Sequence, residues 1–268
     1  MRCGLWTGVL LLSATAALAQ DAPPEIRQFD IATIEALGRE MYEQDQYVWH
    51  ATDALMAIHP AAEMQQQKIH GWIVAEGPTG NRVRYIRDGA NGPEAAFDIG
   101  IAAGKWDISE PRDRTLNDAE MAQYRARILA LSKVARPCSD RYNTVVLHDP
   151  EGDNWLVWAL ASSTTPKTWF IGGNYRFTIS KDGNSILRTD ALSRGCLTMT
   201  EPPTQPDKKL AAQFSVQLVS KLPLETGVFI SLQTEVPMIV AMPDRAMWAI
   251  AGGKAFKLDE KLPEPPAK

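Results

Sequence analysis

Apolar residues first recur with the period of an α-helix in the segment that begins near residue 30. Asp30 stands where an N-cap residue accepts a hydrogen bond from the first turn, and Phe29 before it can pack on Ile34. Pro60 interrupts the pattern. We therefore predict a helix from Asp30 to about Met56, whose apolar face is made of Ile34, Leu37, Met41, Val48, Ala51 and Leu55.

After residue 71 the hydrophobic period changes to two, which is typical of β-strands. Residues 72–75 and 82–86 flank the turn sequence GPTG, and this arrangement predicts a hairpin. Residues 95–101 predict a third strand. Residues 107–116 are rich in charge, and we expect a loop there.

A second helix is predicted to begin at Asn117. Glu120 follows three residues later, which is the spacing of a capping box. Pro137 stops the helix. The residues at helical spacing, which we expect to form its buried face, are Met121, Tyr124, Ile128 and Leu131.

The rest of the chain is predicted to be mostly strand. The pair Asp182-Gly183 between two apolar runs is a strong signal for a tight hairpin. Residues 200–209 form a Pro-rich connector, and residues 259–268 a frayed tail. The predicted strands are residues 144–147, 154–161, 168–180, 185–189, 213–219, 228–233, 238–242 and 247–250.

This order of elements predicts an α+β fold in which each of two helices is followed by antiparallel strands and packs on a sheet. A helix followed by a meander occurs twice, at residues 29–106 and in a larger, strand-rich unit at residues 116–258. The arrangement resembles a tandem of cystatin-like units. The resemblance implies two helix-on-sheet layers.

The first 19 residues have the layout of a secretory signal peptide. Arg2 provides the positive start, an apolar run covers residues 5–12, and Ala17 and Ala19 are the small residues of a cleavage site. We expect cleavage after about Ala19 and export to the periplasm or beyond, with Cys3 removed together with the leader.

The composition of the chain excludes several classes of protein. The chain has 268 residues, 45% of them apolar and 22% charged, with a formal net charge of −4. These proportions are too apolar for a disordered chain, and there is no excess of positive charge to drive nucleic-acid binding. After the leader, no apolar run is long enough to span a membrane. We expect a globular exported protein without a membrane span.

Two cysteines, Cys138 and Cys196, remain after the leader is removed. An even number of cysteines in an exported chain favours a disulfide. A disulfide that closes the loop between these two residues would contribute ~4 kcal/mol to stability in the chain-entropy model. Two free structural thiols are the alternative.

The string Ser193-Arg194-Gly195-Cys196 resembles the nucleophile motif of the L,D-transpeptidases, exported enzymes whose cysteine attacks a peptidoglycan stem peptide. The resemblance implies a cell-envelope acyl transferase or hydrolase with Cys196 as its nucleophile. That chemistry requires a thiolate and an imidazole to take its proton. The family's upstream His-Gly pair has no counterpart at residues 171–176, and Thr198 stands where the family has an arginine.

The segment Gly172, Gly173, Asn174, Tyr175 and Arg176 permits a bulge or close backbone approach, and it is our candidate binding surface. The alternating acids of the turn at residues 148–153 are interpreted as a solvated turn, and we predict no metal site and no cofactor.

The sequence thus favours an exported, non-catalytic binding or assembly protein, with a protein or cell-envelope component as its partner. The cysteine enzyme is the alternative, and a glycan hydrolase that uses two carboxylates stays open.

Overall fold

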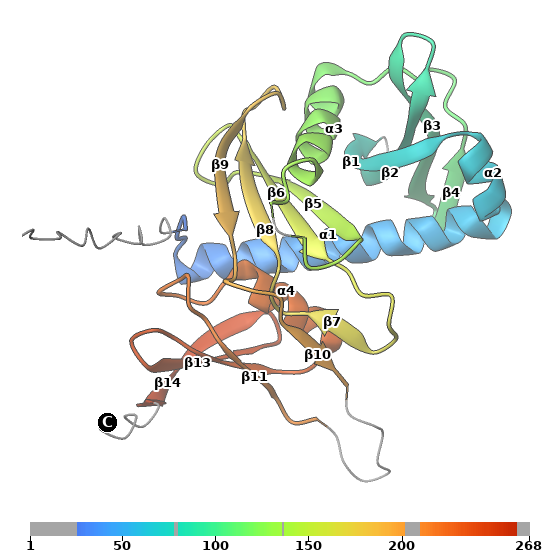
Figure 1. The fold of residues 1–268 in the computed structure, drawn as a ribbon. Coiled ribbons are helices and arrows are strands. Elements are labelled where there is room, and N and C mark those ends of the chain that lie inside the picture. Colours follow the sequence, from blue (N-terminus) through green and yellow to red (C-terminus); the bar gives the residue numbers. More distant parts are fainter. Residues whose placement is uncertain (1–25, 78–79, 136, 202–209, 262–268) are drawn as a thin grey trace, which may run out of the picture.

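The computed structural model describes residues 26–77, 80–135, 137–201 and 210–261, which form a mixed α+β fold (Figure 1). The predicted signal peptide lies outside these ranges. Within them there are four helices: α1 (Ile31–Ile58), α2 (Ala61–Gln66), α3 (Asp118–Leu131) and α4 (Glu225–Thr234).

The strands of the described ranges form four sheets, and every neighbouring pair is antiparallel except the parallel pair β11–β12. The N-terminal sheet contains β1 (Ile69–Gly77), β2 (Gly80–Gly89), β3 (Gly92–Ala102) and β4 (Lys105–Ser109). The central sheet contains β5 (Tyr142–His148), β6 (Trp155–Ala161), β8 (Tyr175–Ile179) and β9 (Ile186–Ala191). A small sheet pairs β7 (Thr168–Phe170) with β10 (Thr198–Thr200). The C-terminal sheet contains β11 (Gln213–Val216), β12 (Met238–Ala241), β13 (Ala246–Ala251) and β14 (Lys254–Lys261).

Helix α1 begins as the sequence predicts, because the Asp30 side chain accepts a hydrogen bond of 2.7 Å from the Thr33 amide. Its first half packs into a hydrophobic core that also includes residues of the central sheet, α4 and the C-terminal sheet. Its second half packs on the N-terminal sheet. Figure 1 shows α1 passing between the central sheet and α4. One long helix therefore packs against both predicted units of the chain.

Helix α3 has the predicted capping box, with Asn117 and Glu120 each bonded to the other's main-chain amide. The predicted buried face is right in part: Tyr124 is buried and Met121 packs beside it, but Ile128 is exposed. The face that packs on the central sheet consists of small residues, namely Ala122, Ala126 and Ala130. Because these side chains are small, the helix can lie close to the sheet. Residues near its start also contact the N-terminal sheet, so α3 lies between the two sheets.

Further elements differ from the sequence-based expectation, and the strand predicted at residues 168–180 is divided into β7 and β8. Residues 228–233, predicted as a strand, form most of α4, whose residues are buried against α1 and the C-terminal sheet. Their β-branched and aromatic side chains favour a strand, but packing decides the outcome. The expected loop at residues 107–116 begins with part of β4, in which Trp106 and Ile108 alternate with polar residues. Strand β14 extends to Lys261, so the predicted frayed tail begins inside a strand.

The α+β class is seen in the structure. The tandem cystatin-like arrangement stays a prediction.

Candidate functional site

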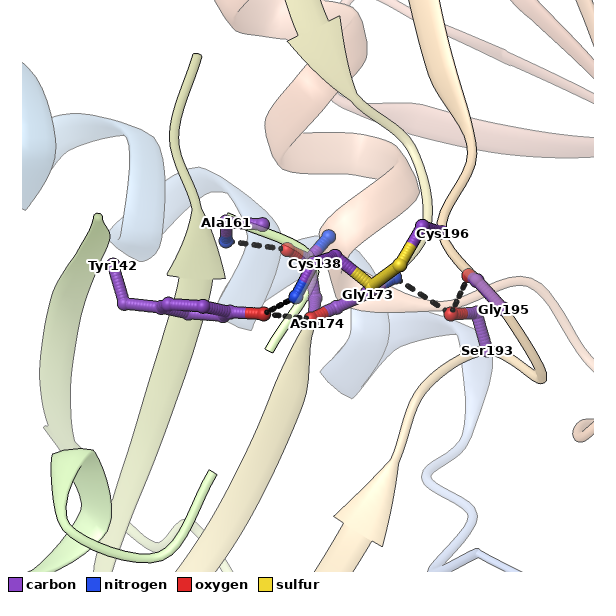
Figure 2. Close-up of a disulfide and its surroundings, with 8 residues drawn as sticks. All are labelled: Cys138, Tyr142, Ala161, Gly173, Asn174, Ser193, Gly195 and Cys196. Atoms are coloured by element: carbon purple, nitrogen blue, oxygen red, sulfur yellow. Dashed lines mark hydrogen bonds between the residues drawn. A yellow bond between two sulfur atoms is a disulfide. The ribbon is translucent and has the colours of Figure 1, made fainter. Parts of the chain in front are cut away.

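Cys138 and Cys196 are joined in a disulfide across a sequence separation of 58 residues, with their Cα atoms 5.4 Å apart (Figure 2). Cys138 precedes β5 and Cys196 precedes β10. The bond therefore ties the start of the central sheet to the loop before the small sheet. A disulfide sulfur is not a thiolate, so Cys196 does not have the state that a cysteine nucleophile needs.

Of the two glycines in the predicted binding surface, Gly173 packs against this disulfide and Gly172 packs against the loop that contains Cys196. Gly173 has a φ of +89°, and a Cβ there would lie 2.5 Å from the Cys138 sulfur. A Cβ on Gly172 would lie 2.5 Å from the carbonyl oxygen of Gly195. Figure 2 shows the Gly173 amide donating to the Ser193 hydroxyl at 2.7 Å. The glycines are therefore needed for close approach of the disulfide and its loop.

The remaining three residues of that predicted surface are buried as well. Asn174 accepts a hydrogen bond of 2.9 Å from the Ala161 amide, and Tyr175 packs in the core beside α3. Because Gly172, Gly173, Asn174, Tyr175 and Arg176 are all buried, they offer little surface to a partner. A binding role for this segment stays a prediction.

Arg176 lies at the centre of a buried ion network. Its side chain is 1% exposed and lies 2.9 Å from Asp190 and 2.8 Å from Glu225. The Trp158 indole also donates to Glu225, at 2.8 Å. A further bond to the main-chain oxygen of Arg27 joins the network to the segment before α1. The network thus connects the central sheet, α4 and the N-terminal segment, and its role is structural.

A cleft of about 1000 Å³ has Asn174 in its wall. It is bounded by the edge of the central sheet, by β7 and by the C-terminal half of α4. The side chains that give it polar character are Asp45, Asn143, Ser162, Ser163, Lys167, Thr168, Asn174, Glu201, Gln233, Thr234 and Glu235. Its apolar part includes Leu160, Trp169, Phe170, Phe229, Ile230 and Val236.

Asp45 is the distinctive group of this cleft. It projects from the middle of α1 and has no hydrogen-bond or ion-pair partner among the described residues. Burial without a compensating charge raises the pKa of its carboxyl to about 6. A carboxyl with a perturbed pKa in a large cleft is a marker of a functional site.

Two of the other charged groups of the cleft form an ion pair with each other, and the third is exposed. Lys167 forms an ion pair of 3.2 Å with Glu201. Glu235 is exposed at the C-cap of α4, where it has a φ of +55°. Because Lys167 and Glu201 neutralise each other, the ionised carboxylates of Asp45 and Glu235 give the cleft a negative balance. The Trp169 ring is oriented by a bond of 3.1 Å from its indole nitrogen to Gln213.

The acidic turn before β6 has a different role from the solvated turn that the sequence predicts. Asp149 is buried and lies 2.6 Å from Arg27, which also contacts Glu151 at 2.6 Å. Burial raises the pKa of the Asp149 carboxyl, but the hydrogen bonds from Arg27 and from the Glu151 amide, together with the charges of Arg27 and Arg176, outweigh it, so the net pKa lies below the ordinary value. The turn therefore holds the N-terminal segment. The described residues contain no group of three or more side chains arranged to hold a metal ion.

Comparison with protein-family models, with curated proteins and with solved structures finds no match for this chain. Among the described helices none is both long and apolar enough to cross a bilayer.

The cleft was not predicted from the sequence, because its walls come from segments that are distant along the chain. Asp45 lies on the polar side of α1, where an acidic residue is expected to be solvated. The predicted residue Asn174 does line the cleft, and Gly172 lines a second, smaller cavity of about 220 Å³ beside the disulfide.

Proposed function

We propose that this chain is an exported binding protein that holds a positively charged ligand in the cleft beside Asp45. The single observation that carries the proposal is an unpartnered carboxyl in a cleft of about 1000 Å³. Small-molecule sites have volumes of ~300–1,000 Å³ and combine apolar walls with a few polar groups, as this cleft does.

The charge of the cleft favours a cation. Above a pH of about 6 the Asp45 carboxyl is ionised, and no cationic side chain of the described chain neutralises it. A primary ammonium or guanidinium group of the ligand would replace the missing partner, because opposite charges within a few ångströms favour each other's charged form. Trp169 and Phe170 line the same space, and an aromatic ring beside a bound cation adds a cation–π contact.

Export is part of the same proposal. The leader-like first 19 residues and the disulfide are both typical of proteins that enter an oxidising compartment. The ligand would then be a component of the cell envelope or of the surrounding medium. The cysteine-enzyme alternative requires a free thiolate at Cys196, whereas this sulfur is bonded to Cys138. Binding is therefore favoured over that chemistry.

Titration with an amine tests the proposal. The probe is spermidine, with the uncharged 1,5-pentanediol as its control, and the signals are the heat of binding and tryptophan fluorescence at pH 8. Saturable binding of spermidine, but not of the diol, is expected. It should weaken below pH 5, because protonation of Asp45 removes the charge that attracts the amine.

A matched pair of variants localises the effect. Asp45→Asn should weaken spermidine binding by about tenfold or more, the loss of one charge-assisted contact. Asp53→Asn removes the same charge from the same helix at an exposed position outside the cleft, and it should leave binding unchanged. Equal effects of the two variants, or no saturable binding by the wild type, would refute the proposal.

A further inference from the structure

The outer face of the C-terminal sheet is formed by alternate residues of its four strands. Strand pairing places Phe214, Ile239, Ala249 and Phe256 in one row across the sheet. It places Val216, Ala241, Met247 and Leu258 in the neighbouring row. All eight side chains are apolar.

Seven of these eight residues are partly or largely exposed, and Ala241, which lies between Val216 and Met247 in its row, is buried. Residues of the opposite face, such as Met238, Val240 and Ile250, belong to the core shared with α1 and α4. Within the described part of the chain, none of the eight outer residues belongs to a hydrophobic core cluster. The outer face is therefore available to another surface.

The composition of this face is unusual for a sheet that packs on one side. An antiparallel sheet with one covered face normally has polar residues on the other. Here Phe214 is 51% exposed, Phe256 is 54% exposed and Val216 is 53% exposed. Together the three side chains leave roughly 300 Å² of apolar surface in water, a patch size that often marks an interaction site.

We propose that this face binds the same face of a second copy of the chain. A two-fold interface must be complementary to itself, and an apolar face with no charged side chain in either row meets that condition without like-charge repulsion. Two such sheets can stack ~10 Å apart, with their side chains interdigitated as in a β-sandwich.

The area places the contact in a size class. With the partly exposed residues between the two phenylalanines, each copy would contribute roughly 600 Å², the size of a small specific interface. Contacts at the low end of interface sizes include weak, transient encounters, and we expect a dissociation constant on the order of micromolar. The dimer is thus expected to be reversible rather than obligate.

The charge and the sequence of the chain argue against two other occupants of this face, a membrane surface and a segment of the same chain. An anionic membrane surface attracts proteins through clustered Lys and Arg, whereas this chain has a net charge of −4 and the two rows carry no cation. The chain outside the described ranges that would remain after export is polar or Pro-rich, as in PPTQPDKK and LPEPPAK. It supplies no apolar segment to cover the face.

Sedimentation velocity of the mature protein, between about 1 and 100 µM, tests the proposal. The wild type should change from monomer to dimer over this range. Phe214→Lys and Phe256→Lys, at the two ends of one row, should each raise the dissociation constant at least about tenfold, because each would bury a charge at the interface. Unchanged circular dichroism establishes that a variant is folded.

Leu187→Lys is the matched control, since this residue is 57% exposed on β9 and lies outside the face. It should dimerise as the wild type does. A wild type that stays monomeric at 100 µM overturns the proposal, including one that instead binds lipid vesicles. Dimerisation that both face variants leave unchanged, or that Leu187→Lys weakens equally, overturns it as well.

Discussion

Replacement of Asp45 by asparagine is expected to stabilise the protein at alkaline pH. The carboxyl has a pKa of about 6 in the folded state, against an ordinary value of 3.8, because burial disfavours its charged form. Asparagine keeps the shape of the side chain and removes the charge. The substitution therefore isolates the free energy that the folded protein loses by burying an unpaired carboxylate.

The pKa of Asp45 gives the sign and the size of the expected change in the free energy of unfolding. Because the folded state holds the proton more tightly than the unfolded state, the stability contribution of Asp45 is greatest below pH 4 and falls as the pH rises through about 6. A shift of about two pKa units corresponds to ~3 kcal/mol, and partial access of the side chain to water reduces this to about 1–3 kcal/mol.

Urea unfolding of the wild type and Asp45→Asn at several pH values between 4 and 8 measures the effect. The difference between the two proteins cancels the pH dependence of every other titrating group, provided that these groups do not couple to Asp45. We expect Asp45→Asn to be more stable by about 1–3 kcal/mol at pH 8, with a difference near zero at pH 4. A difference that is independent of pH, or a less stable variant at pH 8, would refute the reasoning.

Three further predictions concern the disulfide and the buried ions. Reduction of the bond between Cys138 and Cys196 should lower the free energy of unfolding by ~4 kcal/mol, measured by urea titration with and without dithiothreitol. Gly173→Ala should lower it by about 2–4 kcal/mol, because the new Cβ is strained by the positive φ and meets the disulfide sulfur. Arg176→Met should lower it by about 3–5 kcal/mol, because it leaves the Glu225 carboxylate buried without its cation and leaves Asp190 with only Arg188 as a cation in the described part of the chain.

Each of these has an outcome that would contradict it. For Gly173 the control is Gly104→Ala, which has a φ of +73° and open space around the new Cβ, so equal losses would mean that the disulfide contact is irrelevant. A protein whose stability ignores dithiothreitol would show that the bond does not constrain the fold. For Arg176→Met, a loss below 1 kcal/mol would show that the network tolerates the missing cation.

Local signals in the sequence predicted the local features of the fold. The N-cap at Asp30, the capping box at Asn117 and the Asp182-Gly183 hairpin depend on neighbours within a few positions, and the structure confirms all three. In contrast, α4 was predicted as a strand, because its buried environment is created by α1 and the C-terminal sheet and is not encoded locally.

The cleft around Asp45 could not be predicted from the sequence, because it too is formed by segments that are distant along the chain. Asp45 lies on the solvent-facing side of a helix pattern, and it becomes partly buried because β5, β7 and α4 meet beside it. Cys138 and Cys196 could be paired because they alone remain after the leader. The glycines beside them were recognised as a site of close approach, but the sequence could not show that the disulfide fills that space.

An NMR titration of the Asp45 side-chain carboxyl carbon, with and without spermidine, tests the proposed binding site most directly. In the free protein this carboxyl should titrate with a pKa of about 6, and saturating spermidine should lower that pKa. A carboxyl that titrates near 3.8, or one whose pKa spermidine does not move, would contradict the account.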